Sequence, residues 1–213
     1  MSNQAFAHLP PERQKTIIDC GIAAFAHSGY AEASTDAITK ACGIAKGLLF
    51  HYFGSKRAFY LRCMREALDR LMVAPPELPD GGFYDVLFAS MDQKLRLYLT
   101  CPDEIHFMSL AAWDTAADIV KEKGEIFREY QTVTAAASAQ TITRALETLR
   151  LREPQNALVH DALALYIGAI NNKFLVAYRE RPEAFFQDGE AIKAQIKAHI
   201  DLMLYGIIER GAQ

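Results

Sequence analysis

Several features that would indicate other classes of protein are absent from this chain of 213 residues. Its four cysteines are widely spaced and form no CxxC pair, which argues against a disulfide framework or a zinc site and favours a reducing, cytoplasmic environment. The longest purely apolar run, glycine included, extends from Ala162 to Ile170. That is far short of the ~18 residues that a membrane span needs. The first ten residues contain neither a basic stretch nor a long apolar run, so we expect no secretory signal.

Motifs that carry catalytic or cofactor chemistry are also missing. The chain contains no GxSxG, HExxH, P-loop or GxGxxG motif, and its six histidines are scattered without ligand spacing. We therefore expect a protein that is not an enzyme and that uses no metal and no cofactor. The composition, 51% hydrophobic and 23% charged, is typical of a globular protein long enough to bury a sizeable core.

The most informative stretch is Ala33 to Tyr60, with the sequence ASTDAITKACGIAKGLLFHYFGSKRAFY. Ser34 is a favourable N-cap for a short helix, and Gly43 can adopt the left-handed conformation that ends it. A second short helix is expected from about residue 45 to 53, followed by a third that begins after an N-cap at Ser55. Two short helices that meet at a tight turn predict a helix-turn-helix.

The charge of this region differs from that of the rest of the chain. Residues 11–73 carry a net charge of +3, while the remainder carries −6. No acidic residue lies between Asp36 and Glu66. The basic residues of that interval are Lys40, Lys46, Lys56, Arg57, Arg62 and Arg65. A local positive surface on an acidic protein favours a polyanionic partner, although a solvated helix surface would have the same composition.

These residues resemble the DNA-binding domain of TetR-type transcriptional regulators over about residues 11–60. The resemblance is carried by Gly29-Tyr30, Ser34-Thr35, Ile38, Ala41, Gly43-Ile44, Lys46-Gly47 and above all the run KGLLFHYFGSK. It implies a homodimer that binds a palindromic double-stranded DNA operator. It also implies a regulator, with repression the expected effect, that a small-molecule effector releases from DNA.

The predicted fold is all-α with three parts. Residues 1–54 are expected to form the helix-turn-helix domain, 55–74 a connecting helix, and 75–213 a helical ligand-binding and dimerisation domain. The proline- and glycine-rich segment 75–82 is the clearest break. Helices are expected at about 11–27, 83–101, 102–113 or further, 125–151, 155–181 and 188–209, with Lys123-Gly124 as a stop and a short turn at 183–186.

The last two long helices, within about residues 155–210, are apolar around most of their circumference. A helix without a polar face must be covered on every side, and a chain of this size has few elements to do so. We therefore expect these helices to form a dimer interface, as the resemblance also implies. The alternative is a monomer whose terminal helices are well buried.

Candidate base contacts lie on the second short helix. Lys46 can reach phosphate or guanine, Gly47 permits close approach to DNA, and Leu48 faces outward if its neighbour Leu49 faces in. His51 lies one turn beyond Leu48 and is placed for a base edge or phosphate. A lone histidine can equally have a structural role.

Candidate phosphate contacts flank this helix. Tyr52 and Lys56 match the phosphate contacts of the resembled family. Ser34 and Thr35 can present hydroxyl and backbone N–H groups to a phosphate at a helix N-terminus. For Ser34 a plain capping role is the alternative, and the two roles are compatible.

Candidate effector contacts come from the aromatic-rich central helices. Pockets are mostly apolar with a few polar groups, so we expect a small, largely apolar ligand. The candidates are Tyr84, Phe88, His106, Trp113, Asp114 and Asn171. Each could also be an ordinary core or interface residue. A helical interaction module without a DNA role is the remaining alternative, and it leaves the basic stretch unexplained.

Overall fold

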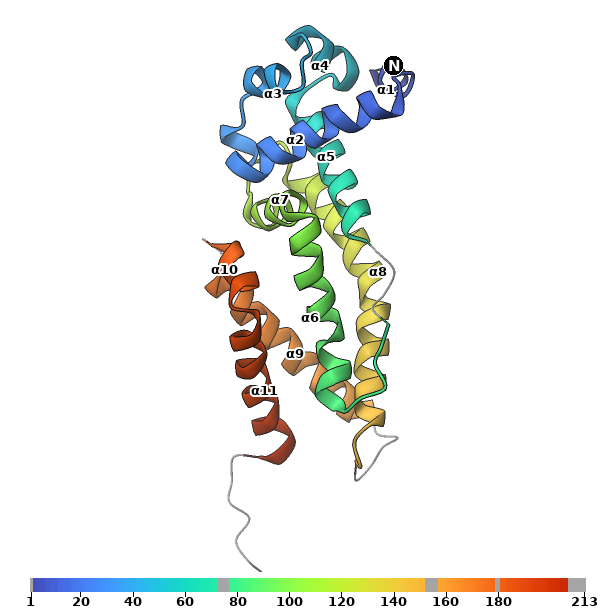
Figure 1. The fold of residues 1–213 in the computed structure, drawn as a ribbon, viewed down its shortest axis with the longest axis vertical. Coiled ribbons are helices and arrows are strands. Elements are labelled where there is room, and N and C mark those ends of the chain that lie inside the picture. Colours follow the sequence, from blue (N-terminus) through green and yellow to red (C-terminus); the bar gives the residue numbers. More distant parts are fainter. Residues whose placement is uncertain (1, 73–76, 152–156, 179–180, 207–213) are drawn as a thin grey trace, which may run out of the picture. The chain divides into compact units, whose positions relative to one another are not determined.

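The computed structural model describes residues 2–72, 77–151, 157–178 and 181–206. Within these ranges all regular structure is helical, which confirms the all-α prediction (Figure 1). The helices are α1 Ser2–Ala7, α2 Pro11–Glu32, α3 Thr35–Ala41, α4 Lys46–Phe53, α5 Lys56–Leu71, α6 Phe83–Thr100, α7 Pro102–Trp113, α8 Val120–Glu147, α9 Ala157–Ala177, α10 Pro182–Gln187 and α11 Gly189–Tyr205. Within the same ranges, none of them is both long and apolar enough to cross a bilayer.

The chain divides into two compact units. The first unit comprises Met1–Ala74 and Leu97–Val133, and the second comprises Pro75–Arg96 and Thr134–Gln213. The division therefore falls within α6 and α8, each of which contributes residues to both units. The predicted boundary between residues 74 and 75 lies outside the described residues, and the three functional parts stay a prediction.

Local capping signals produce the predicted helix-turn-helix. The Ser34 hydroxyl accepts a hydrogen bond from the Ala37 amide at 3.4 Å, and Ser55 does the same for Ala58 at 3.1 Å. Gly43 has φ +63°, and Gly54, which follows α4, has φ +77°. Both values are in the left-handed region, where glycine carries no Cβ penalty. The predicted punctuation of this stretch is thus confirmed.

The core of the first unit extends beyond helices α2, α3 and α4. Phe25 of α2, Tyr60 of α5 and Phe107 of α7 are buried together, with ring centroids 4.9 to 5.6 Å apart. Gly21 lets α2 and α5 approach closely, because a Cβ there would lie 2.4 Å from Phe59 Cζ and 2.5 Å from Cys63 Sγ. Residues from α7 and the start of α8 are therefore part of the support for the helix-turn-helix.

The prediction that Lys123-Gly124 stops a helix is wrong. α8 begins at Val120 and passes through both residues. The Lys123 ammonium is buried and donates to the carbonyls of Ala111 and Asp114, which end α7. The break lies at residues 114–119 instead, where the Asp114 carboxylate accepts a hydrogen bond from the Ala116 amide at 2.9 Å. The tertiary role of Lys123 outweighs the ~1 kcal/mol that glycine costs inside a helix.

Two other short elements differ from expectation. Residues 2–7 form α1, which no sequence pattern indicated, and the expected turn at 183–186 is the helix α10. α2 is assigned through Glu32, although Gly29 (φ 65°, ψ −174°) interrupts its helical conformation where a stop was predicted.

The second unit has its own core. Leu163, Ile170 and Phe174 of α9 are buried with Ile192 and Ile200 of α11. Phe83 and Val86 from the first turn of α6 and Ala145 and Leu146 of α8 belong to the same core. The opposite sides of α9 and α11 are exposed and apolar, as described below.

Candidate nucleic-acid interface

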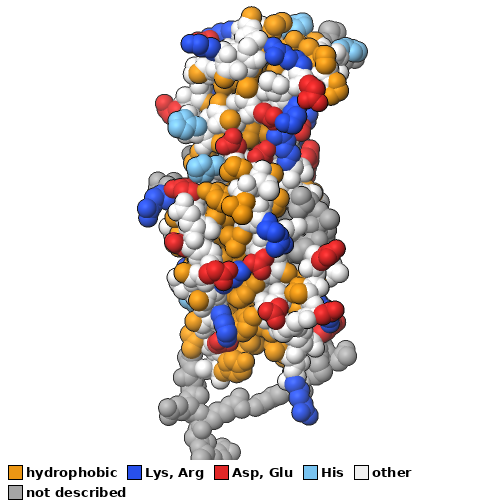
Figure 2. Space-filling model, in the orientation of Figure 1, with side chains coloured by type: hydrophobic (Ala, Val, Ile, Leu, Met, Phe, Trp, Pro, Cys, Tyr) orange, Lys and Arg blue, Asp and Glu red, His pale blue; other side chains and the backbone are white. Residues whose placement is uncertain are grey.

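Helix α4 presents one face to the core and one to solvent. Leu49 and Phe53 are buried, whereas Leu48 is 41% exposed. Lys46, Gly47 and His51 are exposed as well. The predicted orientation of α4 is therefore confirmed, and the base contacts of these four residues stay a prediction. Figure 2 shows Lys and Arg side chains over the part of the chain where Figure 1 draws α2–α5.

The start of α4 is tied to α3. Lys46 Nζ lies 2.9 Å from the Asp36 carboxylate, and both side chains are more than half exposed. Such surface pairs contribute about 0–1 kcal/mol, so Lys46 can exchange this partner for a phosphate at little cost. The turn before α4 is fixed more firmly, because Arg13 donates to the Gly43 carbonyl at 2.8 Å. Sequence analysis did not identify Arg13, whose contact spans thirty residues.

Lys56 has partners within the first unit. Its ammonium donates to the Ala31 carbonyl at 3.0 Å and lies 5.0 Å from the centroid of the Tyr30 ring. Tyr30 in turn donates to the carboxylate of Asp118, and burial together with this bond raises the pKa of Tyr30 to about 12. Lys56 is thus held at the start of α5, and its predicted phosphate contact is untested.

The neighbouring Arg57 connects α5 to the α7–α8 segment. It donates to the Asp118 carbonyl and pairs with Glu122, and this hydrogen bond holds the pKa of Glu122 below its ordinary value. Farther along α5, Arg65 pairs with Glu129 at 3.0 Å. The helix that follows the helix-turn-helix is therefore fastened to residues 118–129 at two points.

The remaining predicted DNA contacts lie around α3 and α4. Tyr52 is half-buried, with its ring centroid 5.8 Å from His51 and 6.0 Å from Phe6. Ser34 caps α3, and Thr35 is its first residue. All eight predicted residues thus fall within one short stretch of the first unit, from the α3 N-cap to the first residue of α5.

The six predicted effector contacts are divided between the units. Tyr84, Phe88 and Asn171 belong to the second unit, and His106, Trp113 and Asp114 belong to the first. Tyr84 donates to Asp201 and stacks on Phe88 at 5.7 Å, while Asn171 is exposed. Asp114 shapes the turn after α7 through its bond to Ala116. A common effector site for these residues stays a prediction.

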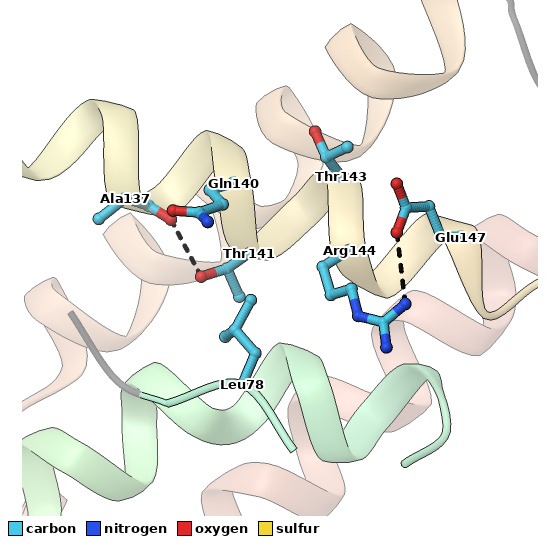
Figure 3. A pocket seen from close by; sticks show the side chains of 7 residues that line it. All are labelled: Leu78, Ala137, Gln140, Thr141, Thr143, Arg144 and Glu147. Atoms are coloured by element: carbon cyan, nitrogen blue, oxygen red, sulfur yellow. Dashed lines mark hydrogen bonds and ion pairs between the residues drawn. The ribbon is translucent and has the colours of Figure 1, made fainter. Parts of the chain in front are cut away.

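A pocket of about 440 Å³ lies within the second unit (Figure 3). Its lining residues are Leu78, Ala137, Gln140, Thr141, Thr143, Arg144 and Glu147. None of the six predicted effector contacts is among them. Thr141 donates to the Ala137 carbonyl, and Arg144 pairs with Glu147, so these polar groups already have partners. Across the part of the chain that the structure describes, no cluster of His, Cys, Asp and Glu is suited to hold a metal ion.

The capped α3, the tight turn at Gly43 and the outward face of α4 define a helix-turn-helix DNA-binding protein. Residues 17–63 match the family model described as "Bacterial regulatory proteins, tetR family". Residues 17–63 are therefore a TetR-type DNA-binding domain, and the protein is a transcriptional regulator.

Individual proteins resemble this chain either over a short stretch or over nearly its whole length. The transcriptional dual regulator CecR of Shigella flexneri is 25% identical over 229 positions, with 99% of each chain covered. The uncharacterized regulator YuxN of Bacillus subtilis is 37% identical over 59 residues, which cover 28% of this chain but only 20% of YuxN. A transcriptional regulator from Rhodococcus has the same fold, with a TM-score of 0.63 and 22% identity over 92% of this chain and 97% of that one.

Proposed function

We propose that this regulator is a repressor that binds a palindromic operator as a homodimer and that a small, largely apolar molecule releases it. The observation that carries the proposal is the exposure of Lys46, Gly47, Leu48 and His51 on the short helix α4. A helix of two turns reads few bases. Two copies at a separation of one helical turn of DNA or a multiple would read an inverted repeat.

Dimerisation is supported by the exposed apolar side chains of the second unit. Leu158, Leu165 and Val176 of α9 are 71%, 76% and 55% exposed, and Leu202 and Tyr205 of α11 are 52% and 74% exposed. Spacings of seven and eleven residues in α9 and of three in α11 place each set on one helix face. Figure 2 shows hydrophobic side chains gathered over the region where Figure 1 draws these helices. A second copy of the chain would cover them.

Release by an effector is supported by the attachment of α5 to the α7–α8 segment. Arg57 and Arg65 fasten α5 to Asp118, Glu122 and Glu129. A molecule that favours a different position of this segment would move α5 and, with it, the recognition helices relative to the two half-sites. Its effect cannot exceed the difference between its affinities for the two states.

Selection from a random duplex library with the wild-type protein tests the operator proposal. We expect the bound sequences to share an inverted repeat. Unenriched sequences, or a single unrepeated motif, would contradict the proposal. A thermal-shift screen of small apolar compounds, followed by titration of the selected duplex, then tests release. The proposal of an effector is wrong if no stabilising compound changes the affinity for DNA.

Two variants test the phosphate contacts. Lys56→Ala should reduce the slope of log affinity against log salt by about 0.9. Tyr52→Phe should weaken binding to selected and scrambled duplexes by similar factors, because phosphate contacts carry no sequence information. Lys197→Ala removes the same charge from α11 of the second unit and is the matched control. An unchanged slope and affinity for Lys56→Ala would show that Lys56 does not contact phosphate.

A further inference from the structure

Helix α1 packs against the recognition helix α4, although none of the predicted DNA contacts lies on it (Figure 1). Phe6 is the residue that makes this contact. Its side chain is 3% exposed, and its ring centroid lies 4.8 Å from that of Phe53 and 6.0 Å from that of Tyr52. Both partners belong to the last turn of α4.

The turn between α1 and α2 fixes the position of Phe6. Gln14 of α2 donates to the carbonyls of Ala7 at 3.2 Å and Leu9 at 2.8 Å. The Leu9 amide donates to the Phe6 carbonyl at 3.1 Å, and the Leu9 side chain packs against the core. α1 is therefore held to α2 by polar contacts and to α4 by apolar ones.

Helix α4 depends on such support because it has only eight residues. Isolated helices of this length are not stable, so tertiary contacts determine its orientation. Inside the first unit its anchors are Leu49 and Phe53. The Phe53 ring contacts Phe59 of α5 at 4.7 Å and Phe6 at 4.8 Å. Without Phe6, the last turn of α4 would keep aromatic support from α5 but lose it from α1.

We propose that α1 is a positioning element for DNA recognition, with Phe6 as the residue that holds α4 in its base-reading orientation. This inference rests on the proposed base contacts of α4. Residues 2–9 contain no Lys or Arg, so attraction to phosphate does not account for a contribution of α1 to DNA binding. The expected effect is on specificity: a tilted α4 loses contacts to bases, while phosphate contacts from other elements remain.

The test compares Phe6→Ala with the wild type on two duplexes: one selected by the wild type from a random library, and a scrambled duplex of equal composition. We expect Phe6→Ala to bind the selected duplex about tenfold more weakly, which corresponds to ~1.4 kcal/mol of binding free energy. Its affinity for the scrambled duplex should be nearly unchanged. Phe6→Leu, which keeps an apolar contact, should recover most of the selectivity. His8→Ala changes an exposed side chain of the same segment and is the matched control.

A second measurement separates positioning from stability. Hydrogen exchange of the DNA-free protein should be faster in Phe6→Ala at the α4 amides than at those of α5. Gln14→Ala loosens α1 without touching α4 and should reduce selectivity in the same direction, which covers the case in which Phe6→Ala does not fold. Equal selectivity in the wild type and both variants would overturn the inference. A wild type that selects no sequence would instead overturn the proposed function.

Discussion

The two units of this regulator bury their side chains to different degrees. The largest side chains of the described residues with less than 2% exposure are mostly in the first unit, including Phe25, Tyr60 and Phe107, whereas Leu163 and Ile192 represent the second. Ion pairs between distant segments occur in both units, such as Arg57 with Glu122 in the first and Lys193 with Asp92 in the second. The second exposes large apolar side chains on α9 and α11. The proposed dimer would account for this difference, because a second copy of the chain would cover the exposed side chains of the second unit.

The largest expected effect comes from a charge on the exposed apolar face. Leu165→Glu places an unpaired carboxylate where we propose the dimer interface, which costs several kcal/mol on burial. We expect the dimer dissociation constant to rise by roughly a hundredfold or more, as measured by sedimentation velocity. Affinity for the selected duplex should fall with it.

Two variants accompany this measurement. Thr143→Glu adds the same charge to an exposed position of α8 and is the control. Ile170→Glu should unfold the protein rather than separate subunits, because Ile170 is buried in the core of its own unit. A wild type that sediments as a monomer at micromolar concentration would contradict both the dimer and the comparison drawn above.

The next effect tests how tightly the first unit is packed. A Cβ at Gly21 would overlap the buried Phe59 ring and Cys63, so Gly21→Ala should destabilise the protein by about 1–3 kcal/mol in urea unfolding. Gly168→Ala of α9 meets no atom within 4 Å and should be neutral or stabilising. Both are best measured in the Leu165→Glu background, where the interface is absent. Equal costs for the two would show that the units do not differ in packing.

An intermediate effect is expected at the Arg70 ion-pair cluster. Arg70 of α5 pairs with Asp19 of α2 at 2.7 Å and Glu104 of α7 at 2.9 Å, and Glu104 is only 9% exposed. Arg70→Met leaves that carboxylate without its cation, and we expect a loss of about 2 kcal/mol of stability after allowance for solvent. Lys197→Met breaks the exposed pair with Asp201 in the second unit and should destabilise the protein less than Arg70→Met does. Similar losses of stability in the two variants would show that these ion pairs do not distinguish the two units.

The smallest effect concerns acid stability. Burial raises the pKa of Asp19, but its hydrogen bonds with Lys15 and Arg70 outweigh this and hold the pKa below the ordinary 3.8. A carboxylate whose pKa is lowered by folding stabilises the folded state at pH values above its pKa in the unfolded chain. This contribution is lost as the pH falls through the pKa of the folded state. Asp19→Asn should therefore flatten the acid side of the stability curve, measured from about pH 6 down to 3. An unchanged curve would assign acid sensitivity to other carboxylates.

Local signals in the sequence predicted the helix-turn-helix because its boundaries depend on nearby residues. Ser34 and Ser55 act through amides three residues ahead, and Gly43 acts through its own backbone. Outward exposure of Leu48 followed from helical periodicity. The base and phosphate contacts themselves depend on DNA, so they stay a prediction.

The features that sequence analysis missed depend on contacts between distant segments. Tyr30 and Asp118 are 88 residues apart, and Arg57 and Glu122 are 65 apart, so no short pattern indicates either pair. Helix α1 lacks a helical hydrophobic pattern and owes its position to Phe6. Lys123-Gly124 has the composition of a stop, but the buried Lys123 ammonium finds its carbonyl partners at the end of α7.

The first unit is discontinuous along the chain, and this has a consequence for its synthesis. Phe107, which packs on both Phe25 and Tyr60, is translated after Pro75–Arg96 of the second unit. At ~5–20 residues per second, the ribosome needs several seconds between Ala74 and the end of this unit at Val133. During that interval the nascent helix-turn-helix has an apolar surface that only later residues cover. Chaperones and proteases therefore have access to this apolar surface of the nascent chain until the start of α8 has emerged.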